Sequence, residues 1–332
     1  MKKLSLLFAA IIATTMMFAQ SIQLATLSHS GNITTFYGAT ALSQAHAAAV
    51  NGDVITLSSG SFNGVNITKA VTIRGAGNGM DTIPNMVPTI INSDFTINVP
   101  ANDSTHLTLE GLYHNGTITL RGAKNILVLK CRLFDVVSSY SSDLGAIDGT
   151  FLHCKIHDYS AKGNASMINS VISAAYDASN FIFTNCIIFY AYVTNSTFYN
   201  CIIRFDENLE SSNLAYNCVG EDLYSPSNNI FSDLPNNRSN TVVSLSTMFE
   251  TPDIMSNTHE EGGIVIGDTE FFHLSAQGMN YLGNDGKQVG IHGGNMPFDP
   301  RTTIPQITRC NVAPKSTADG KLSVDIEVNV AE

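Results

Sequence analysis

The chain has 332 residues, of which 14% are charged, and its formal net charge is −11. Serine, threonine, asparagine and glycine are frequent, a composition that favours a β-rich fold with polar turns over a helical fold. The acidic balance argues against nucleic acid as a partner, because phosphates attract clustered lysine and arginine. It also disfavours a strongly polyanionic glycan, unless a local basic patch overrides the average charge.

The N-terminus has the layout of a secretory signal peptide. Lys2 and Lys3 precede an apolar run over residues 4–18, and the small residue Ala19 follows this run. We expect cleavage after Ala19, so that residues 1–19 are removed. The run is shorter than the ~20 residues that a transmembrane helix needs, and no later stretch is apolar enough to span a bilayer. The sequence therefore predicts a secreted, extracellular or cell-surface protein, with the periplasm as an alternative.

Residues 20–298 are predicted to form one elongated β domain that begins with a helical cap. Residues 39–50 are rich in alanine, carry apolar residues at helical spacing and end at Asn51-Gly52, which is a common helix stop. A helix there would cover the first coil and protect its unpaired strand edges. Residues 53–77 then alternate as short strands separated by turns.

A sequence repeat follows in the middle of the chain. Each copy ends a run of aromatic or β-branched residues with a cysteine or serine, and an asparagine usually stands directly before it. Successive copies are 15 to 17 residues apart, except for 23 residues between the first two. This period predicts a β-solenoid, in which each coil adds short strands to parallel sheets. The repeated residues are Cys131, Cys154, Cys186, Cys201 and Cys218, and Asn169, Asn185, Asn200 and Asn217.

The repeated residues are predicted to be structural. Stacked asparagines can hydrogen-bond their equivalents on the neighbouring coils and so satisfy polar groups inside a turn. The repeated cysteines lie in apolar strand contexts, which favours buried free thiols. Disulfides or a metal site are the alternatives, since cysteines of an exported protein commonly pair.

Three segments resemble the pectin-lyase-like superfamily of right-handed parallel β-helices. Residues 52–62 and 69–77 are similar to the opening coils of this superfamily, and the Asn-Cys-Ile-Ile coils resemble its inner stacks. Residues 283–294 look like the closing segment of its secreted Bacteroidetes members. The resemblance implies an all-β, right-handed parallel β-helix with an N-terminal capping helix. It assigns no activity, because this scaffold supports lyases, hydrolases, adhesins and other proteins.

Residues 299–332 are predicted to be a linker and a C-terminal β-strand extension. Asp299-Pro300 and Ile304-Pro305 read as linker, and residues 321–330 alternate strictly enough to form one strand. A single strand is not a domain. We expect it either to pack along the solenoid or to begin a further module.

Matching ionisable residues on two adjacent coils form the best candidate site. If Cys131 and Cys154 point inward, alternation turns the residues that follow them outward in one column. Such a patch would combine cations, a possible base and carboxylates for metal or sugar hydroxyls. A solvated solenoid face also explains the same residues, and this simpler interpretation is the favoured one. The candidate catalytic residues are Arg132, Lys155, His157 and Asp158, and Asp135 is a candidate ligand-binding residue.

Other polar and aromatic residues are weaker candidates. Exposed tyrosines could stack on sugar rings, although packing at strand faces explains them as well. A second polar group lies further along the chain, and two histidines are predicted to be a turn residue and a core or edge residue, respectively. These residues are Tyr190, Tyr192 and Tyr199 for stacking, Arg204 with Asp206, Glu207 and Glu210 for the polar group, and His114 and His273 for the histidines.

The sequence leaves three functions open. We expect a monomeric, non-catalytic secreted or cell-surface protein that binds extracellular polysaccharide or another surface ligand and needs no cofactor. The alternatives are a polysaccharide lyase or glycoside hydrolase acting on an acidic glycan, with calcium possible for a lyase, and a structural spacer of a larger surface assembly. No catalytic signature is present: the adjacent aspartate pair of the superfamily's pectin hydrolases is missing, and only Arg132, Lys155, Asp135 and Asp158 approach the acidic and basic set of its lyases.

Overall fold

The computed structural model describes most of the chain after the expected signal peptide, which itself lies outside the described residues. Among the described residues, no helix has the length and apolarity needed to cross a membrane. The described residues are 23–80, 87–99, 106–122, 124–138, 147–205, 211–222, 229–234, 239–250, 272–303, 305–312, 320–321 and 323–329.

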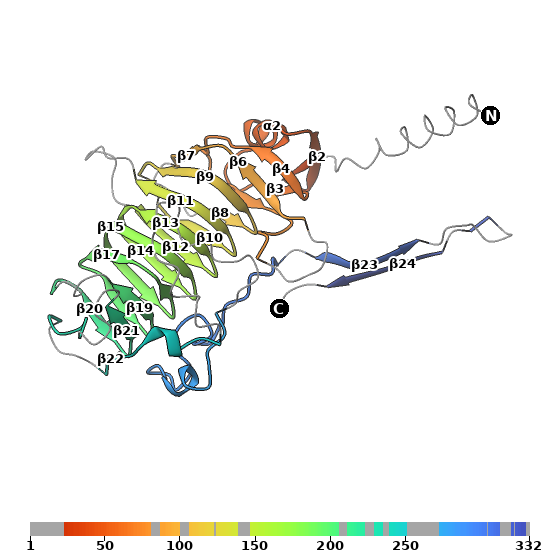
Figure 1. Cartoon of the computed structure of the whole chain (residues 1–332). Helices are drawn as coiled ribbons and strands as arrows, with labels where there is room; N and C mark the ends of the chain where they lie inside the picture. The colour runs from red at the N-terminus through yellow and green to blue at the C-terminus, as the bar shows by residue number, and fades with distance from the viewer. Residues whose placement is uncertain are drawn as a thin grey trace, which may run out of the picture.

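The protein is an all-β solenoid, as the sequence predicts. Short strands on successive coils pair in parallel, and the coils stack along one axis from the orange N-terminal end to the green C-terminal end (Figure 1). Each coil contributes strands to up to three faces, which we call faces A, B and C. Strand residues alternate between the interior and the outside, so every face has a buried inner side and an outward side.

Face A carries one strand from almost every coil. Its strands pair in parallel and in chain order along the axis. They are β3 (Val54–Leu57), β5 (Thr72–Arg74), β8 (Leu107–Glu110), β10 (Ile126–Leu129), β12 (Ile147–Leu152), β14 (Lys162–Ile168), the end of β15 (Val171–Thr184), β18 (Thr197–Tyr199) and β20 (Leu214–Tyr216).

Faces B and C share long strands that bend where the two faces meet. Face B contains β4 (Gly60–Asn63), β6 (Thr89–Asn92), the first parts of β9 (Tyr113–Leu120), β11 (Arg132–Ser138), β13 (Lys155–Ser160) and β15, and then β16 (Ile187–Ile188), β19 (Ile202–Phe205), β21 (Val219–Asp222) and β22 (Thr241–Val242). Face C contains β7 (Phe95–Ile97), the later parts of β9, β11, β13 and β15, and β17 (Ala191–Thr194).

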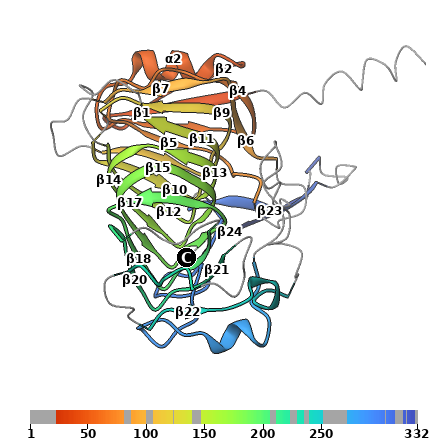
Figure 2. The ribbon, with the colours of Figure 1, turned by 60° about the vertical axis from the view of Figure 1, so that its left-hand side comes forward.

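The N-terminal cap closes the first coil, as expected. An antiparallel hairpin of β1 (Leu24–His29) and β2 (Asn32–Tyr37) pairs through β1 with β3. The helix α2 (Ala41–Ala48) lies across this end of the solenoid (Figure 2) and buries the side chains of Ala41, Leu42 and Ala45 on the core. Because the cap covers the open end of the coil stack, the first parallel strands do not present a bare edge.

The repeated asparagines form a column of tight turns between faces A and B, which we call the turn column. The φ angle is positive at all four of them, with values of 44° at Asn169, 52° at Asn185, 55° at Asn200 and 52° at Asn217. Asparagine tolerates this left-handed conformation better than most residues, which explains the repeat. One predicted contact between equivalents is present, since Asn200 Nδ2 donates to Asn185 Oδ1 over 3.2 Å.

The cysteines that follow the turn column point into the core. Cys131, Cys154, Cys186, Cys201 and Cys218 are buried free thiols, which agrees with the favoured sequence interpretation. Burial raises the pKa of the Cys154 thiol to about 12, so this group stays protonated and unreactive at neutral pH. Aromatic rings stack beside them, and the Phe183 and Phe198 rings are 4.9 Å apart and nearly parallel.

The chain returns along the turn column after the last coil. Residues 281–303, which we call the strap, run back toward the N-terminal end and bond to successive turns. Asn284 exchanges hydrogen bonds with Asn200, and Asn169 Nδ2 donates to the carbonyls of Ile291 and Gly293, each over 2.9 Å. The asparagines therefore bond to the strap as well as to one another.

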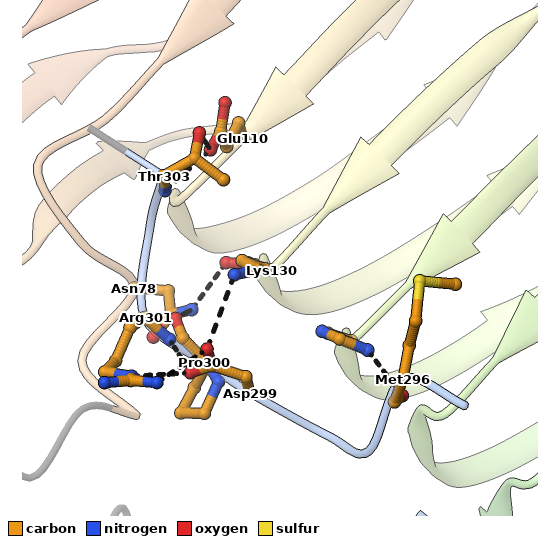
Figure 3. A network of polar contacts seen from close by, with 9 residues as sticks. Asn78, Glu110, Lys130, Met296, Asp299, Pro300, Arg301 and Thr303 are labelled. Atoms are coloured by element: carbon orange, nitrogen blue, oxygen red, sulfur yellow. Dashed lines mark hydrogen bonds and ion pairs between the residues drawn. The ribbon is translucent and has the colours of Figure 1, made fainter. Parts of the chain in front are cut away.

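The last residues of the strap, 299–303, are held by charged and polar groups of coils nearer the N-terminal end of the solenoid (Figure 3). Lys130 Nζ lies 3.7 Å from Asp299 Oδ2, and Asn78 Nδ2 donates to the Pro300 carbonyl over 3.0 Å. Buried Glu110 accepts hydrogen bonds from the backbone and hydroxyl of Thr303. These contacts fasten residues near 300 to coils formed more than 150 residues earlier in the chain.

A hairpin follows the strap. The expected C-terminal strand is present as β24 (Val324–Asn329), but it is not alone, because β23 (Gln306–Val312) pairs with it antiparallel. The register shifts between Ile307 and Arg309, so β23 lacks the regular alternation by which a strand is recognised in a sequence. The hairpin extends away from the solenoid (Figure 1).

Candidate functional site

The outward side of face B changes character along the solenoid axis. Residues in register on successive coils form one outward column, which runs Tyr113, Arg132, Lys155, Val171, Ile187, Ile202 and Val219. From Val171 onward the column is buried in a second hydrophobic cluster, formed with residues of the 243–249 and 272–291 segments. We call these parts of the column the open half and the covered half. The open half is polar and half-exposed.

Arg132 and Lys155 bring two positive charges together in the open half. They are direct register partners on β11 and β13, so their outward side chains lie about one strand spacing apart. The Arg132 guanidinium lies over the Tyr113 ring, 4.5 Å from its centroid. This cation–π contact orients the guanidinium, whose planar edge has the geometry to pair with a carboxylate. The pair forms a local basic patch on an acidic protein.

A bend in β11 places an aromatic ring beside this patch. The register of β11 against β9 shifts between Leu133 and Asp135, and Phe134 at the shift is 41% exposed. Its ring stacks on the His157 ring of the next coil, with centroids 4.5 Å apart and an angle of 7°. The stack covers one face of the imidazole and fixes its orientation.

His157 and two aspartates form a compact group, which we call the polar cluster. Asp135 and Asp158 are register partners on β11 and β13. His157 Nδ1 lies 3.4 Å from Asp158 Oδ2 and 3.9 Å from Asp135 Oδ1. These separations are those of ion pairs rather than of short hydrogen bonds. Asp135 Oδ2 accepts a long hydrogen bond of 3.5 Å from Thr117, and the small Ala174 follows Asp158 on the next coil.

Proximity changes the acidity of the cluster. Burial, and then the neighbouring Asp158 charge, raise the pKa of Asp135. The interaction with Asp158 raises the pKa of His157, although partial burial opposes this change. Asp135 therefore holds a proton more readily than an ordinary aspartate does, and His157 carries positive charge at higher pH than usual. The Asp135 carboxyl, which can accept a proton, and the His157 imidazole, which can donate one when charged, are thus neighbours.

Three polar atoms of the cluster have no hydrogen-bond partner in the described structure. Asp135 Oδ1 and both ring nitrogens of His157 are shielded by surrounding atoms and make no hydrogen bond. A shielded polar atom without a hydrogen bond is unfavourable, and here Asp135 Oδ1 and His157 Nδ1 have the ion-pair contacts within the cluster instead. Ligand hydroxyls can reach the more exposed parts of the cluster, since the side chains of Asp135 and Asp158 are 28% and 39% exposed.

The same atoms could also hold a divalent metal ion. One ligand atom from each of Asp135, His157 and Asp158 lies within 4.8 Å of the other two. A nitrogen with two carboxylate oxygens suits zinc or manganese better than calcium, which prefers oxygen ligands alone. The histidine therefore departs from the calcium site that the lyase alternative implies.

The five candidate residues of the sequence analysis come together here. Arg132, Lys155, His157, Asp135 and Asp158 share the open half and the adjoining bend. Sequence reasoning missed the aromatic partners Tyr113 and Phe134. Exposed aromatic residues flanking the charged positions were the available signal, but the irregular register at the bend hid the Phe134 contact.

The three candidate tyrosines do not form a single platform. Tyr192 is 53% exposed on face C, where it is the register partner of Tyr176. Tyr190 packs its ring 5.0 Å from the same Tyr176. Tyr199 lies on face A instead and stacks on Tyr216, with centroids 5.0 Å apart and an angle of 16°. Stacking within the protein thus uses part of the ring surface that a sugar would need.

The remaining polar candidates are structural or lie outside the described residues. Arg204 is buried, its Nε donates to the Phe189 carbonyl over 3.4 Å, and it is the register partner of Glu221. Residues 206–210, which include the other members of that group, lie outside the described residues. The expected turn residue His114 is instead buried in β9, where its ring packs against Phe95. Alternation along β9 turns it inward, and the strand continues past it to Leu120.

His273 lies at the protein surface. Its side chain is exposed, and its ring stacks on the ring of His292 with centroids 5.5 Å apart.

The fold and site together define a parallel β-solenoid that presents one outward polar cluster beside a basic pair. No protein-family model, no curated protein and no solved structure matches the chain.

Proposed function

We propose that this is a secreted or cell-surface β-helix protein that binds extracellular polysaccharide at the polar cluster and the adjoining basic pair. Its resemblance to the pectin-lyase-like superfamily supports a carbohydrate ligand, and the solenoid fold is compatible with that superfamily. The observation that carries the proposal is the gathering of the partly exposed side chains of Asp135, Asp158 and His157 next to the register partners Arg132 and Lys155.

The charges favour a glycan that carries acidic groups. Arg132 and Lys155 can pair with a sugar carboxylate, and arginine can do so through two parallel hydrogen bonds. Asp135, Asp158 and His157 can bond the neighbouring hydroxyls. The exposed Phe134 edge adds apolar surface next to these groups. A non-catalytic binding role requires nothing further from the site.

A binding screen with charge-matched controls tests this proposal. The mature chain is measured against acidic and neutral polysaccharides, with and without calcium, for binding and for new reducing or unsaturated ends. The double variant Arg132→Ala and Lys155→Ala should weaken binding at least tenfold, whereas Lys124→Ala, at an exposed lysine outside the site, should not change it. Binding that survives the double variant unchanged would refute this site.

A second function is favoured by the raised pKa of Asp135. A carboxyl of raised pKa beside a second carboxyl is the pairing that glycoside hydrolysis uses, and a lyase needs a base and a cation at one sugar. If new chain ends appear in the screen, Asp135→Asn should abolish their release while leaving binding largely intact. Release that continues in Asp135→Asn would place the chemistry elsewhere.

A further inference from the structure

Face A presents an outward surface that differs from the polar cluster. On six successive strands, from β10 to β20, the two outward residues of each strand lie in register with those of the next. They form two parallel columns, which we call the face A strip. Its residues are Leu127, Leu129, Thr150, Leu152, Ser166, Ile168, Ile182, Thr184, Thr197, Tyr199, Leu214 and Tyr216.

The face A strip carries no charge, although the chain as a whole has a net charge of −11. All of its side chains are half-exposed or exposed, and Ile182 and Leu214 are 46% and 37% exposed. The column of Leu129 becomes charged on the next coils toward the N-terminus, where Arg74 and Glu110 form an ion pair with 3.1 Å between Nε and Oε2. The column of Leu127 continues without charge through Thr108 and Thr72, so the strip is uncharged across both columns only on these six strands.

The outward apolar residues of face B lack this exposure. In the same part of the solenoid, Val171, Ile187 and Ile202 are covered by the returning chain and are at most 1% exposed. The chain thus covers one apolar face of these coils and leaves the other in contact with solvent. Exposed apolar surface of this continuity usually marks a binding surface.

The dimensions of the strip favour a narrow ligand. Five steps between neighbouring strands give a length of ~24 Å, and the two columns lie ~7 Å apart. The area between the two column axes is then about 170 Å², well below the ~800 Å² per partner of a stable protein interface. A second copy of this chain or another globular protein would find too little surface here. A polymer chain about one residue wide fits these proportions.

The chemistry of the strip favours sugar over lipid. Half of its residues carry a hydroxyl group, and the others are leucine or isoleucine. Sugar rings likewise combine hydroxyl groups with apolar C–H surface, and a strip without charge offers no pairing partner for acidic groups. A purely apolar ligand would leave the hydroxyl groups of Thr150, Thr184 and Thr197 without partners from the ligand.

We propose that the face A strip is a second carbohydrate site, which binds a neutral, unbranched polysaccharide chain lying along the solenoid axis. The site is separate from the polar cluster, which lies on other faces of the coil. Regular spacing of the coils allows the same contacts to repeat along the polymer. Binding here does not depend on Arg132, Lys155 or the polar cluster.

Retention on neutral polysaccharides tests the proposal. The mature chain is incubated with insoluble cellulose and chitin and is run through gels containing soluble neutral β-glucan or mannan, with polygalacturonate as the acidic contrast. The double variant Thr184→Lys and Thr197→Lys places two charges in the centre of the strip, and Thr35→Lys places one on the exposed strand β2 as a control. Thermal unfolding verifies that each variant is folded.

The expected result is retention of the wild-type protein on at least one neutral glycan. The double variant should bind at least tenfold more weakly, while Thr35→Lys should bind as the wild type does. Absence of retention on every neutral glycan would overturn the proposal, and so would equal retention of the double variant. If sedimentation instead shows a wild-type oligomer that the double variant dissociates, the strip is an interface between copies and the proposal is wrong.

Discussion

The open and covered halves of face B share one backbone arrangement but have opposite outward chemistry. Inside the solenoid both halves carry the same kind of residue, such as Leu133 and Ile156 in one and Ile188 and Ile203 in the other. On the outer side, the column changes from Arg132 and Lys155 to valine and isoleucine where the returning chain packs against the sheet. The residues on the inner side therefore specify the solenoid, whereas the residues on the outer side depend on whether another segment of the chain covers them.

The largest effect is expected from removing an aromatic ring in the covered half. Phe189 is fully buried, and its ring lies 5.5 Å from Phe272 of the covering segment. Phe189→Ala should lower the free energy of unfolding by about 3–5 kcal/mol, because the cavity would remain partly unfilled. The matched variant Phe134→Ala in the open region should cost about 1 kcal/mol or less. Urea unfolding measures both, and equal losses would contradict the division into two halves.

A smaller effect is expected at the strap. Asn169→Ala removes two hydrogen bonds to strap carbonyls and places alanine at a positive φ angle of 44°. We expect a loss of about 2–3 kcal/mol. Asn180→Ala is the control, since Asn180 is exposed and also has a positive φ angle, so it shares only the conformational cost of about 1 kcal/mol. Indistinguishable unfolding midpoints for the two variants would argue against the asparagine contribution to strap binding.

Two histidines, His153 beneath the strap and His157 in the polar cluster, should make the stability of the protein change with pH in opposite directions. Burial lowers the pKa of His153, which bonds the Met296 carbonyl beneath the strap, so its contribution is present above pH 6.5 and is lost as the pH falls below that value. The pKa of His157 is raised, so its contribution is present below pH 6.5 and is lost as the pH rises through the higher, folded-state value.

Thermal unfolding of His153→Gln and His157→Gln between pH 5 and pH 8 measures these contributions. Relative to wild type, the deficit of His153→Gln should shrink at low pH, and that of His157→Gln should shrink at high pH. Parallel curves for the two variants would show that neither histidine is titrated as its surroundings predict.

The smallest effect on stability is expected for the basic pair. Arg132→Ala and Lys155→Ala remove half-exposed side chains, and each should change the free energy of unfolding by no more than about 0.5–1 kcal/mol. Unfolding curves that overlay the wild type would assign the weaker glycan binding of these variants to the site itself. A large loss of stability would instead give Arg132 or Lys155 a structural role.

Local patterns in the sequence were sufficient to predict the solenoid. The 15- to 17-residue spacing identified the coils, and asparagine before cysteine located the turns, because both depend on residues close together in the chain. The 23-residue step between Cys131 and Cys154 placed Asp135 beside Asp158 and Arg132 beside Lys155, since register follows from counting along equivalent strands. The polar cluster could therefore be assembled from the sequence.

The covering contacts could not be predicted in the same way. In the Cys-Ile-Ile segments the first isoleucine points outward and the second inward, and both are apolar, so the pattern does not reveal which residues need a cover. The partners of Asn169 are backbone carbonyls of the strap, and every residue of a chain has a carbonyl group. The β23 strand escaped notice because its bulge breaks the alternation.

The strap changes how such a molecule can come apart. A bare solenoid contains only contacts between neighbouring coils, so it can fray from either end and fold one coil at a time. Here the strap joins Asn78 to Pro300, 222 residues apart, and Glu110 to Thr303, 193 residues apart. Contacts of such long range form slowly and only after the intervening coils exist. Folding should therefore end with the docking of the strap. Because the docked strap links many coils, these coils should unfold together as one cooperative unit.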